Sequence, residues 1–218
     1  MTSKLSLPPT LQTRRLVLRR QQPNDALLIK EAVDTSLPHL QASVAWAQSA
    51  PEPLRVLQAR LAASAAAFDA GDAWTFSIFD QALTRVLGGV GLHRPETALI
   101  SLVGSGALEL GYWLRADAIG LGYATEATAR LIELAFSRLR AQHVVVCHDP
   151  ANTASEGVPR RLGFRCLGRV TADVLPGRQA ADGTIRPETM VWVRDAPDVL
   201  GSRASGMKDS SFRRKPGS

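Results

Sequence analysis

Apolar residues follow two spacings along the chain, and these spacings predict strands and helices. Alternation or β-branched content predicts strands over 11–20, 74–79, 85–92, 108–114, 142–148, 165–175 and 188–194. Spacing of three and four residues predicts helices that begin near Asn24 or Asp25, cover 53–70 and 123–140, and run from Asn152 or Thr153 to Gly163. Over 108–148 the order is strand, helix, strand, which predicts two parallel strands joined by a right-handed crossover. The pattern as a whole predicts a mixed α/β (α+β) fold.

The hydrophobic content fits one domain, which we expect to span residues 1–196. The chain has 218 residues and 45% of them are hydrophobic, which is enough for a full core. Residues 197–218 change to Pro, Gly, Ser, Lys and Arg, and we expect them to form a disordered basic tail. No apolar run reaches about eighteen residues, and residues 1–9 lack the apolar centre of a signal peptide. We therefore expect no membrane span and a cytoplasmic protein.

Much of the formal charge of +6 belongs to the tail. Five basic residues against Asp209 give residues 201–218 a charge of +4 and leave the body near +2. Apart from Phe212, no aromatic residues interleave with these charges, so nucleic acid is an unlikely partner. Cys147 and Cys166 fall in predicted strands, and we expect two small buried residues and no disulfide. The chain has no CxxC and no cluster of His and Cys, so we expect no metal site.

A glycine turn joins the strand 108–114 to the helix 123–140. Gly120 and Gly122 stand one residue apart just before the helix. The first N–H groups of a helix lack intrahelical partners, and glycine lets another molecule approach the backbone closely, so this turn can hold phosphate groups. Plain turn chemistry is the alternative. Neither GxxxxGK[ST] nor the GxGxxG spacing with its later acidic residue is present, so we expect a di- or triphosphorylated cofactor other than ATP or NAD.

This turn resembles motif A of the GNAT N-acetyltransferases, in the RimJ/RimL branch that acetylates ribosomal-protein N-termini. The family carries the pattern [Arg/Gln]-x-x-Gly-x-[Gly/Ala], which aligns with residues 119–124 of this chain. Gly122 and Ala124 match the pattern. Ile119 stands where Arg or Gln is usual, so it does not offer the polar side chain that the family has at this position. The backbone N–H donors of the turn do not depend on that side chain.

Two further stretches carry the same resemblance. Residues 152–164 read N-x-x-S and then V-P-x-x-L-G-F, which resembles motif B, and the opening T-R-R-L-V-L-R followed by P-x-D-A resembles the first strand and helix of the branch. The resemblance implies the GNAT acyl-CoA N-acyltransferase fold, with a mixed central sheet of about six to seven strands flanked by helices. It also implies acetyl-CoA as co-substrate and direct attack by a primary amine, either a protein N-terminal α-amine or a small-molecule amine. Homodimers are common in the family.

The resemblance further implies which residues contact acetyl-CoA. In the family the pantetheine arm lies between the two parallel strands, which splay apart, and it adds to the sheet like an extra strand. Backbone groups of Tyr112, Trp113 and Leu114 are the implied partners of that arm. The other implied contacts are Ile119, Gly120, Leu121, Gly122, Tyr123, Ala124, Thr125, Asn152 and Ser155. Trp46 lies in the segment that covers the acceptor pocket in the family, with simple core packing as its alternative.

The transfer needs a neutral amine and a proton for the leaving thiolate. An α-amine with a pKa near ~7.8 costs about 1 kcal/mol to deprotonate at pH 7, whereas a lysine near ~10.4 costs roughly 4.6 kcal/mol. Glu109, on the strand face opposite Leu108 and Leu110, is the candidate base, directly or through water. A surface salt bridge is its alternative. Ser155, which matches the family position near the thioester sulfur, is the candidate acid, and a hydrogen bond to its own helix backbone is the alternative.

Other features of the sequence leave alternatives open. Ile119 motivates a second hypothesis, a non-catalytic acyl-CoA-binding or regulatory module. The glycines in the strand 85–92 leave little side chain on one face, which marks either a closely approaching ligand or a bulge. We expect His93, just after that strand, to be a solvated or capped residue.

Overall fold

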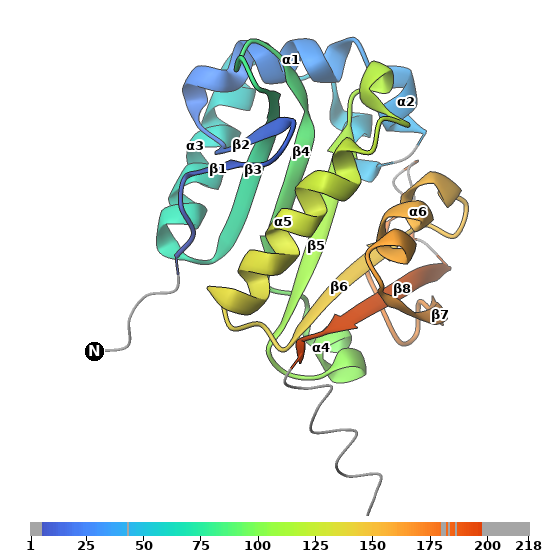
Figure 1. Ribbon diagram of the computed structural model, residues 1–218. Helices are drawn as coiled ribbons and strands as arrows, with labels where there is room; N and C mark the ends of the chain where they lie inside the picture. Colours follow the sequence, from blue (N-terminus) through green and yellow to red (C-terminus); the bar gives the residue numbers. More distant parts are fainter. Residues whose placement is uncertain (1–5, 43, 180–181, 183, 186, 198–218) are drawn as a thin grey trace, which may run out of the picture.

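The computed structural model describes residues 6–42, 44–179, 182, 184–185 and 187–197, so the predicted tail lies outside it except for Pro197. Eight strands form one sheet in the order β1-β2-β3-β4-β5-β6-β8-β7 (Figure 1). The strands are β1 (Thr10–Gln12), β2 (Leu16–Arg20), β3 (Ala73–Asp80), β4 (Val86–His93), β5 (Ala107–Leu114), β6 (His143–His148), β7 (Arg165–Thr171) and β8 (Glu188–Asp195). The α-helices are α1 (Ala26–Asp34), α2 (Leu37–Gln41), α3 (Leu54–Ala70), α4 (Thr97–Val103), α5 (Tyr123–Ser137) and α6 (Thr153–Arg161). Three short 3₁₀ helices are η1 (Pro23–Asp25), η2 (Ala45–Ser49) and η3 (Ala116–Ala118).

The mixed fold is confirmed, but the sheet has more strands than predicted. The single strand expected over 11–20 is wrong, because β1 and β2 form an antiparallel hairpin there. The chain turns at Thr13, whose N–H donates to the carbonyl of Leu16 at 2.9 Å. This turn contains no Gly, Pro, Asn or Asp, so its sequence lacks the usual turn residues.

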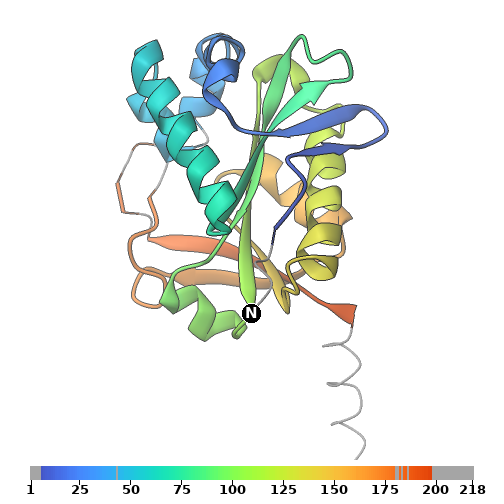
Figure 2. The same ribbon diagram turned by 90° about the vertical axis from the view of Figure 1, so that its left-hand side faces the viewer.

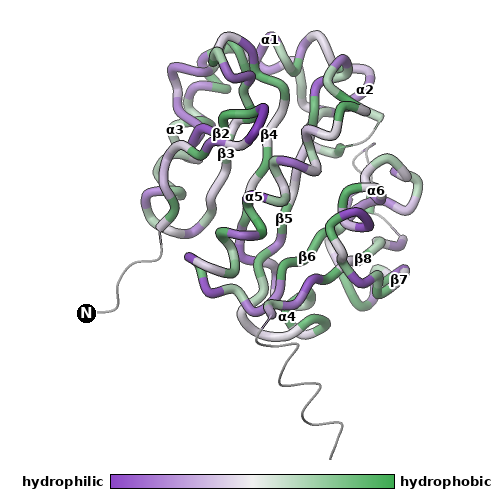
Figure 3. The backbone as a smooth tube through the Cα atoms, in the orientation of Figure 1, coloured by the Kyte–Doolittle hydropathy of each residue, from purple (hydrophilic) through white to green (hydrophobic). Residues whose placement is uncertain are grey.

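Helices cover both faces of the sheet. Figure 2 shows α3 and α5 on opposite sides of the central strands. On the α5 face, Ala127, Leu131 and Ala135 belong to the same buried cluster as Phe76 and Leu110. A second cluster joins α1 and α3 to the other side of the sheet, and a third packs α4 against β6 and β8. Hydropathy alternates along α5, as expected for a helix with one buried face, whereas β6 is apolar along most of its length (Figure 3).

The predictions miss one helix, and one expectation about local structure fails in part. The helix α4 is not predicted, because its sequence TALISLV is short and apolar and has no helical spacing that sets it apart from a strand. The expectation of two buried cysteines is wrong, since Cys166 is exposed and Cys147 is only half-buried. Neither cysteine takes part in a disulfide. Cys166 lies on β7 at the edge of the sheet, where one side of the strand has no neighbour.

The parallel strands β5 and β6 diverge, as the resemblance implies. They pair at three positions, from Ala107 with His143 to Glu109 with Val145, and β5 then continues to Leu114 without a partner on that side (Figure 1). The carbonyl of Gly106 accepts from the N–H of Gln142 beside β6, whereas the N–H of Arg115 donates to Leu87 beside β4. Backbone groups alternate sides along a strand. The even-numbered residues Tyr112 and Leu114 therefore direct their N–H and C=O groups into the gap, and Trp113 directs its groups toward β4.

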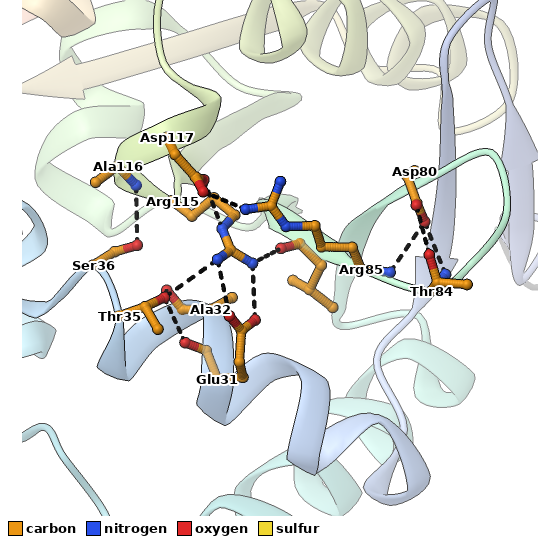
Figure 4. Close-up of polar contacts among 11 residues, drawn as sticks. Glu31, Ala32, Thr35, Ser36, Asp80, Thr84, Arg85, Arg115, Ala116 and Asp117 are labelled. Carbon is orange, nitrogen blue, oxygen red and sulfur yellow. Dashed lines mark hydrogen bonds and ion pairs between the residues drawn. The ribbon is translucent and has the colours of Figure 1, made fainter.

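Buried Arg115 fastens the end of β5 to the helical layer (Figure 4). Its two terminal nitrogens donate to the carboxylate of Glu31 on α1 at 2.8 and 2.9 Å, and its Nε donates to Asp117 at 2.8 Å. The next N–H, of Ala116, donates to Ser36 Oγ at 3.0 Å. These bonds hold the segment that leads into the Gly120 turn against the start of α2.

Candidate active site

A cavity of about 880 Å³ lies between the end of β5, the glycine turn and α6. Every residue predicted to contact the cofactor lines this cavity except Tyr123. The Tyr123 ring packs instead against the core cluster of the α5 face. The structure therefore brings together residues from motif A, motif B and β5 that lie up to forty-three positions apart, as the Tyr112–Ser155 bond shows.

The glycine turn exposes the N-terminus of α5 to this cavity. Gly120 and Gly122 both have left-handed backbone angles, with φ of 75° and 79°. Gly122 is the N-cap of α5 and has no side chain to accept from the first N–H groups of the helix. A Cβ at Gly120 would meet no other atom within 4 Å, so the space beside the turn is open. This cradle fits an anionic group such as a pyrophosphate, because N–H donors and the helix dipole both favour negative charge.

Arg15, just before β2, supplies a positive charge to the turn. Its Nη1 donates to the carbonyl of Leu121 at 2.9 Å, its guanidinium lies 4.7 Å from the centre of the Tyr123 ring, and it lines the cavity. Glu126 holds it there, accepting from Arg15 Nε at 2.7 Å and from its backbone N–H at 2.8 Å. Partial burial would raise the pKa of Glu126, but hydrogen bonds from Thr13 and Arg15 and the charge of Arg15 outweigh it and lower the pKa. The turn thus has a cation nearby even though Ile119 replaces the usual Arg or Gln.

A second cavity of about 400 Å³ lies on the other face of the sheet. Its walls include Trp46 and Trp113, whose rings meet edge to face at 5.7 Å between centroids. Five residues line both cavities: Val44, Tyr112, Trp113, Asn152 and Ser155. The gap between β5 and β6 therefore joins a space suited to a phosphorylated donor with a smaller space on the opposite face.

Glu109, the predicted base, lies beside the smaller cavity in a tight ion pair. Arg178 donates to both of its carboxylate oxygens, at 2.6 and 2.9 Å, and His93 Nε2 lies 3.5 Å from one of them. Burial alone would raise the pKa of Glu109, but the hydrogen bonds and charges of His93 and Arg178 outweigh it and lower the pKa to about 2. The base role stays a prediction, and this low pKa weighs against it, since a group that stays ionised at pH 7 binds protons weakly.

Ser155, the predicted acid, lies in the first turn of α6 where the two cavities meet. Its N–H donates to the side chain of the N-cap residue Asn152 at 3.2 Å, and its carbonyl accepts from the Tyr112 hydroxyl at 2.8 Å. Burial raises the pKa of Tyr112, although its bond to Ser155 acts in the opposite direction. The Ser155 hydroxyl makes no hydrogen bond to another residue within the described ranges, so it can donate to a ligand. Its acid role stays a prediction.

Two histidines line the smaller cavity and differ in their surroundings. His148 is buried, and its Nε2 accepts from the indole N–H of Trp192 at 3.1 Å, so its Nδ1 carries the proton that is donated to the carbonyl of Asp149 at 2.8 Å. Both ring nitrogens of His148 are occupied. His93 is exposed at the end of β4, in line with the expectation of a solvated residue, and its Nε2 also lies beside Glu109.

Several residues of the site carry no signal in the sequence. Arg178 belongs to the loop between β7 and β8, which has no periodicity, and it meets Glu109 across 69 positions. Arg15 reads as one of several exposed arginines in the first strand, and only the fold brings it to Leu121. Within the described ranges, no group of three or more His, Cys, Asp or Glu residues is arranged to hold a metal ion. The helices described here include none that is long and apolar enough to cross a membrane.

Comparisons with known proteins agree with this geometry. Residues 15–165 match the family model of the acetyltransferase (GNAT) domain. A putative ribosomal N-acetyltransferase, YdaF of Bacillus subtilis (strain 168), is 39% identical over 56 residues, which make up 26% of this chain and 31% of that protein. The matched stretch thus spans about a third of the length of this relative.

Solved structures show the same fold at low identity. The microcin C7 self-immunity acetyltransferase MccE, in complex with acetyl-CoA and AMP, has a TM-score of 0.72 at 17% identity and covers 88% of this chain and 98% of its own. RimL, a ribosomal L7/L12 α-N-protein acetyltransferase in complex with coenzyme A, has a TM-score of 0.72 at 18% identity over 87% and 99% of the two chains. RimJ of Mycobacterium smegmatis has a TM-score of 0.69 at 18% identity over 90% and 94%. The family model covers most of the chain, and the chain therefore belongs to the GNAT acetyltransferase family.

Proposed function

We propose that this acetyltransferase moves the acetyl group of acetyl-CoA to the α-amine of a peptide or protein N-terminus. The observation that carries the proposal is the gap between β5 and β6, which joins the two cavities along Tyr112, Asn152 and Ser155. Acetyl-CoA supplies an activated acetyl thioester when it is bound. A donor on one face and an amine on the other would meet at this gap.

The residues of the larger cavity fit the parts of acetyl-CoA in order. The N–H groups after Gly120 and the guanidinium of Arg15 suit the pyrophosphate. The outward backbone groups of Tyr112 and Leu114 suit the amides of pantetheine, which would pair with β5 as β6 does nearer the start of the strand. Asn152 and Ser155 at the N-terminus of α6 lie where the thioester would end.

The side chains at the gap suit a substrate that needs little help to lose its proton. An α-amine costs only about 1 kcal/mol to deprotonate at pH 7, so a strong base is not required. We propose that the charge of Glu109 attracts the ammonium form of the acceptor; the alternative role of Glu109 is to accept the proton directly. We propose that the Ser155 hydroxyl donates a hydrogen bond to the leaving thiolate. RimL, a ribosomal L7/L12 α-N-protein acetyltransferase whose fold this chain shares, supports a protein N-terminus as acceptor. A homodimer and a cytoplasmic location stay predictions.

The proposal is tested by donor binding and by a screen of acceptors. Acetyl-CoA at about a hundred times its dissociation constant is expected to stabilise the fold by about 2.7 kcal/mol, which a thermal shift detects. Release of the coenzyme A thiol is then followed with N-terminal peptides, lysine peptides and small amines. Binding without turnover of any acceptor, in the wild type and in Glu109→Gln alike, would favour the non-catalytic acyl-CoA-binding module. Failure of acetyl-CoA and coenzyme A to stabilise the protein would contradict both functions.

A second prediction concerns the cation at the turn. Replacement of Arg15 by Gln is expected to raise the KM for acetyl-CoA about three- to tenfold at unchanged kcat, because one partly exposed charge contact to phosphate is lost. Arg14→Gln is the matched control, since Arg14 is also exposed and adjacent but does not line the cavity. Steady-state kinetics with varied acetyl-CoA give the comparison. Equal KM values for the two variants would show that Arg15 has no part in binding the donor.

A further inference from the structure

Glycines leave the sheet bare on the face that holds the smaller cavity. Gly91 on β4 and Gly111 on β5 are direct register partners, and Gly89 with Trp113 and His93 with Glu109 flank them. Paired residues of antiparallel strands share a face, so the bare patch has Trp113 at one end and Glu109 at the other. Gly89, Gly91 and Gly111 all line the cavity.

The three glycines differ in what requires them. A Cβ at Gly89 would lie 2.4 Å from the indole nitrogen of Trp113, and one at Gly91 would lie 3.2 Å from Thr75 Oγ1, so neighbours restrict both positions. A Cβ at Gly111 would meet no atom within 4 Å, and the backbone there does not have the positive φ that favours glycine. Neither packing nor conformation requires glycine at 111. What the missing side chain provides is open space in the cavity.

The charges beside this patch favour an amine and disfavour a carboxylate. Arg178 lies beside Glu109 and is paired to two carboxylates: its Nε donates to Glu96 at 2.8 Å, and each terminal nitrogen donates one hydrogen bond to Glu109. Asp149 adds a further carboxylate to the lining. An acceptor that carries a carboxylate next to its amine would therefore meet the carboxylates of Glu109 and Asp149, with Arg178 already paired to Glu109 and Glu96. An N-terminal residue in a peptide has a neutral amide at that place.

We infer that Gly111 is a specificity-determining residue: the bare surface over Gly91 and Gly111 receives the amine-bearing carbon and first side chain of a peptide N-terminus, in preference to a free amino acid. This inference rests on the proposed function and names the part of the acceptor that the cavity holds. The Trp46–Trp113 pair forms the wall at the end of the patch away from Glu109.

The test compares Gly111→Ala and Gly111→Val with the wild type. Substrates are peptide amides that differ only in a first residue of Gly, Ala, Val or Leu, together with free alanine and alanine amide. After correction for the neutral fraction of each amine at the assay pH, we expect wild-type kcat/KM to be at least about tenfold higher for alanine amide than for free alanine, because like charges placed together are costly. Gly111→Val is expected to lower kcat/KM at least about tenfold for all peptides, and Gly111→Ala to lower it more for Val and Leu than for Gly.

Two further measurements separate this role from a structural one. The melting temperature of Gly111→Ala is expected to equal or exceed that of the wild type, because alanine restricts the unfolded chain and fits the strand. The dissociation constant of acetyl-CoA is expected to stay within about twofold, as with Cys166→Val, a control that adds bulk on an edge strand outside both cavities.

Unchanged kcat/KM in both Gly111 variants would overturn the inference, as would a parallel loss of acetyl-CoA binding or equal use of free alanine and its amide by the wild type. A wild type that binds acetyl-CoA but acetylates none of these amines would instead contradict the proposed function itself.

Discussion

Replacement of Gly120 by Val is expected to weaken acetyl-CoA binding about a hundredfold. The residue would carry a β-branched side chain at φ of 75° and fill space that is open in the cavity, beside the N–H groups at the start of α5. Displacing a pyrophosphate from two charge-assisted hydrogen bonds, at about 1.5 kcal/mol each, costs about 3 kcal/mol, and each 1.4 kcal/mol is about tenfold in affinity.

Gly163→Val is the matched control for this prediction. Gly163 follows α6, has φ of 72°, and also has no atom within 4 Å of an added Cβ, but it does not line the cavity. Both variants are expected to lose roughly 1–3 kcal/mol of stability from backbone strain. Calorimetric titration with acetyl-CoA at a temperature where both remain folded separates strain from binding. A Gly120→Val protein that binds acetyl-CoA as tightly as Gly163→Val would place the phosphates elsewhere.

Local signals in the sequence were enough to predict the elements that carry the donor site. The helix α3 ends where Gly71 adopts a left-handed conformation, and α6 begins where the side chain of Asn152 accepts from Ser155. Such caps depend on residues three or four positions apart, which is why they can be read without the fold. The glycine turn before α5 follows the same logic, so most of the larger cavity was predictable as a set of residues.

Both sides of the site also depend on contacts that no local pattern encodes. Glu109 meets Arg178 across 69 positions, and Glu126 meets Arg15 across 111. Glu126 and Arg130 stand four residues apart on α5, a spacing that favours an ion pair, yet Arg130 bonds Glu133 and Glu126 bonds Arg15. Long-range pairing of this kind follows from topology. Here it gives Glu109 the salt bridge that was the alternative to a base, but in a buried position and not on the surface.

Replacement of Glu109 by Gln is expected to remove about 3 kcal/mol of stability that depends on pH. The ion pair with Arg178 and the contact with His93 lower the pKa of Glu109 from 4.5 to about 2 in the folded protein, and each pKa unit corresponds to about 1.4 kcal/mol. A carboxyl whose pKa is lowered by folding stabilises the folded state above its unfolded pKa. This contribution is therefore complete above about pH 4.5 and is lost as the pH falls toward about 2.

Urea unfolding between pH 5 and pH 2 measures the effect. The free energy of unfolding of the wild type is expected to fall by about 3 kcal/mol more than that of Glu109→Gln over this window, because the amide does not titrate. Asp80→Asn is the control, since Asp80 also has a lowered pKa but is the last residue of β3 and lines neither cavity. Parallel curves of unfolding free energy against pH for the wild type and Glu109→Gln would show that the Glu109 carboxylate is not held in this ion pair in solution.

The same Glu109→Gln variant decides between two roles of Glu109: a general base, or a charge that attracts the ammonium form of the acceptor. A general base contributes about 10²–10⁴-fold to kcat, so its loss would lower kcat by that factor and remove a limb of the pH profile. A carboxylate with a pKa of about 2 is ionised at every pH of a usual assay, and the acid limb then belongs to the substrate amine. On this account Glu109→Gln keeps the acid limb and raises the acceptor KM, while kcat at pH 8 falls less than about tenfold. A larger fall in kcat with the limb abolished would make Glu109 the proton acceptor.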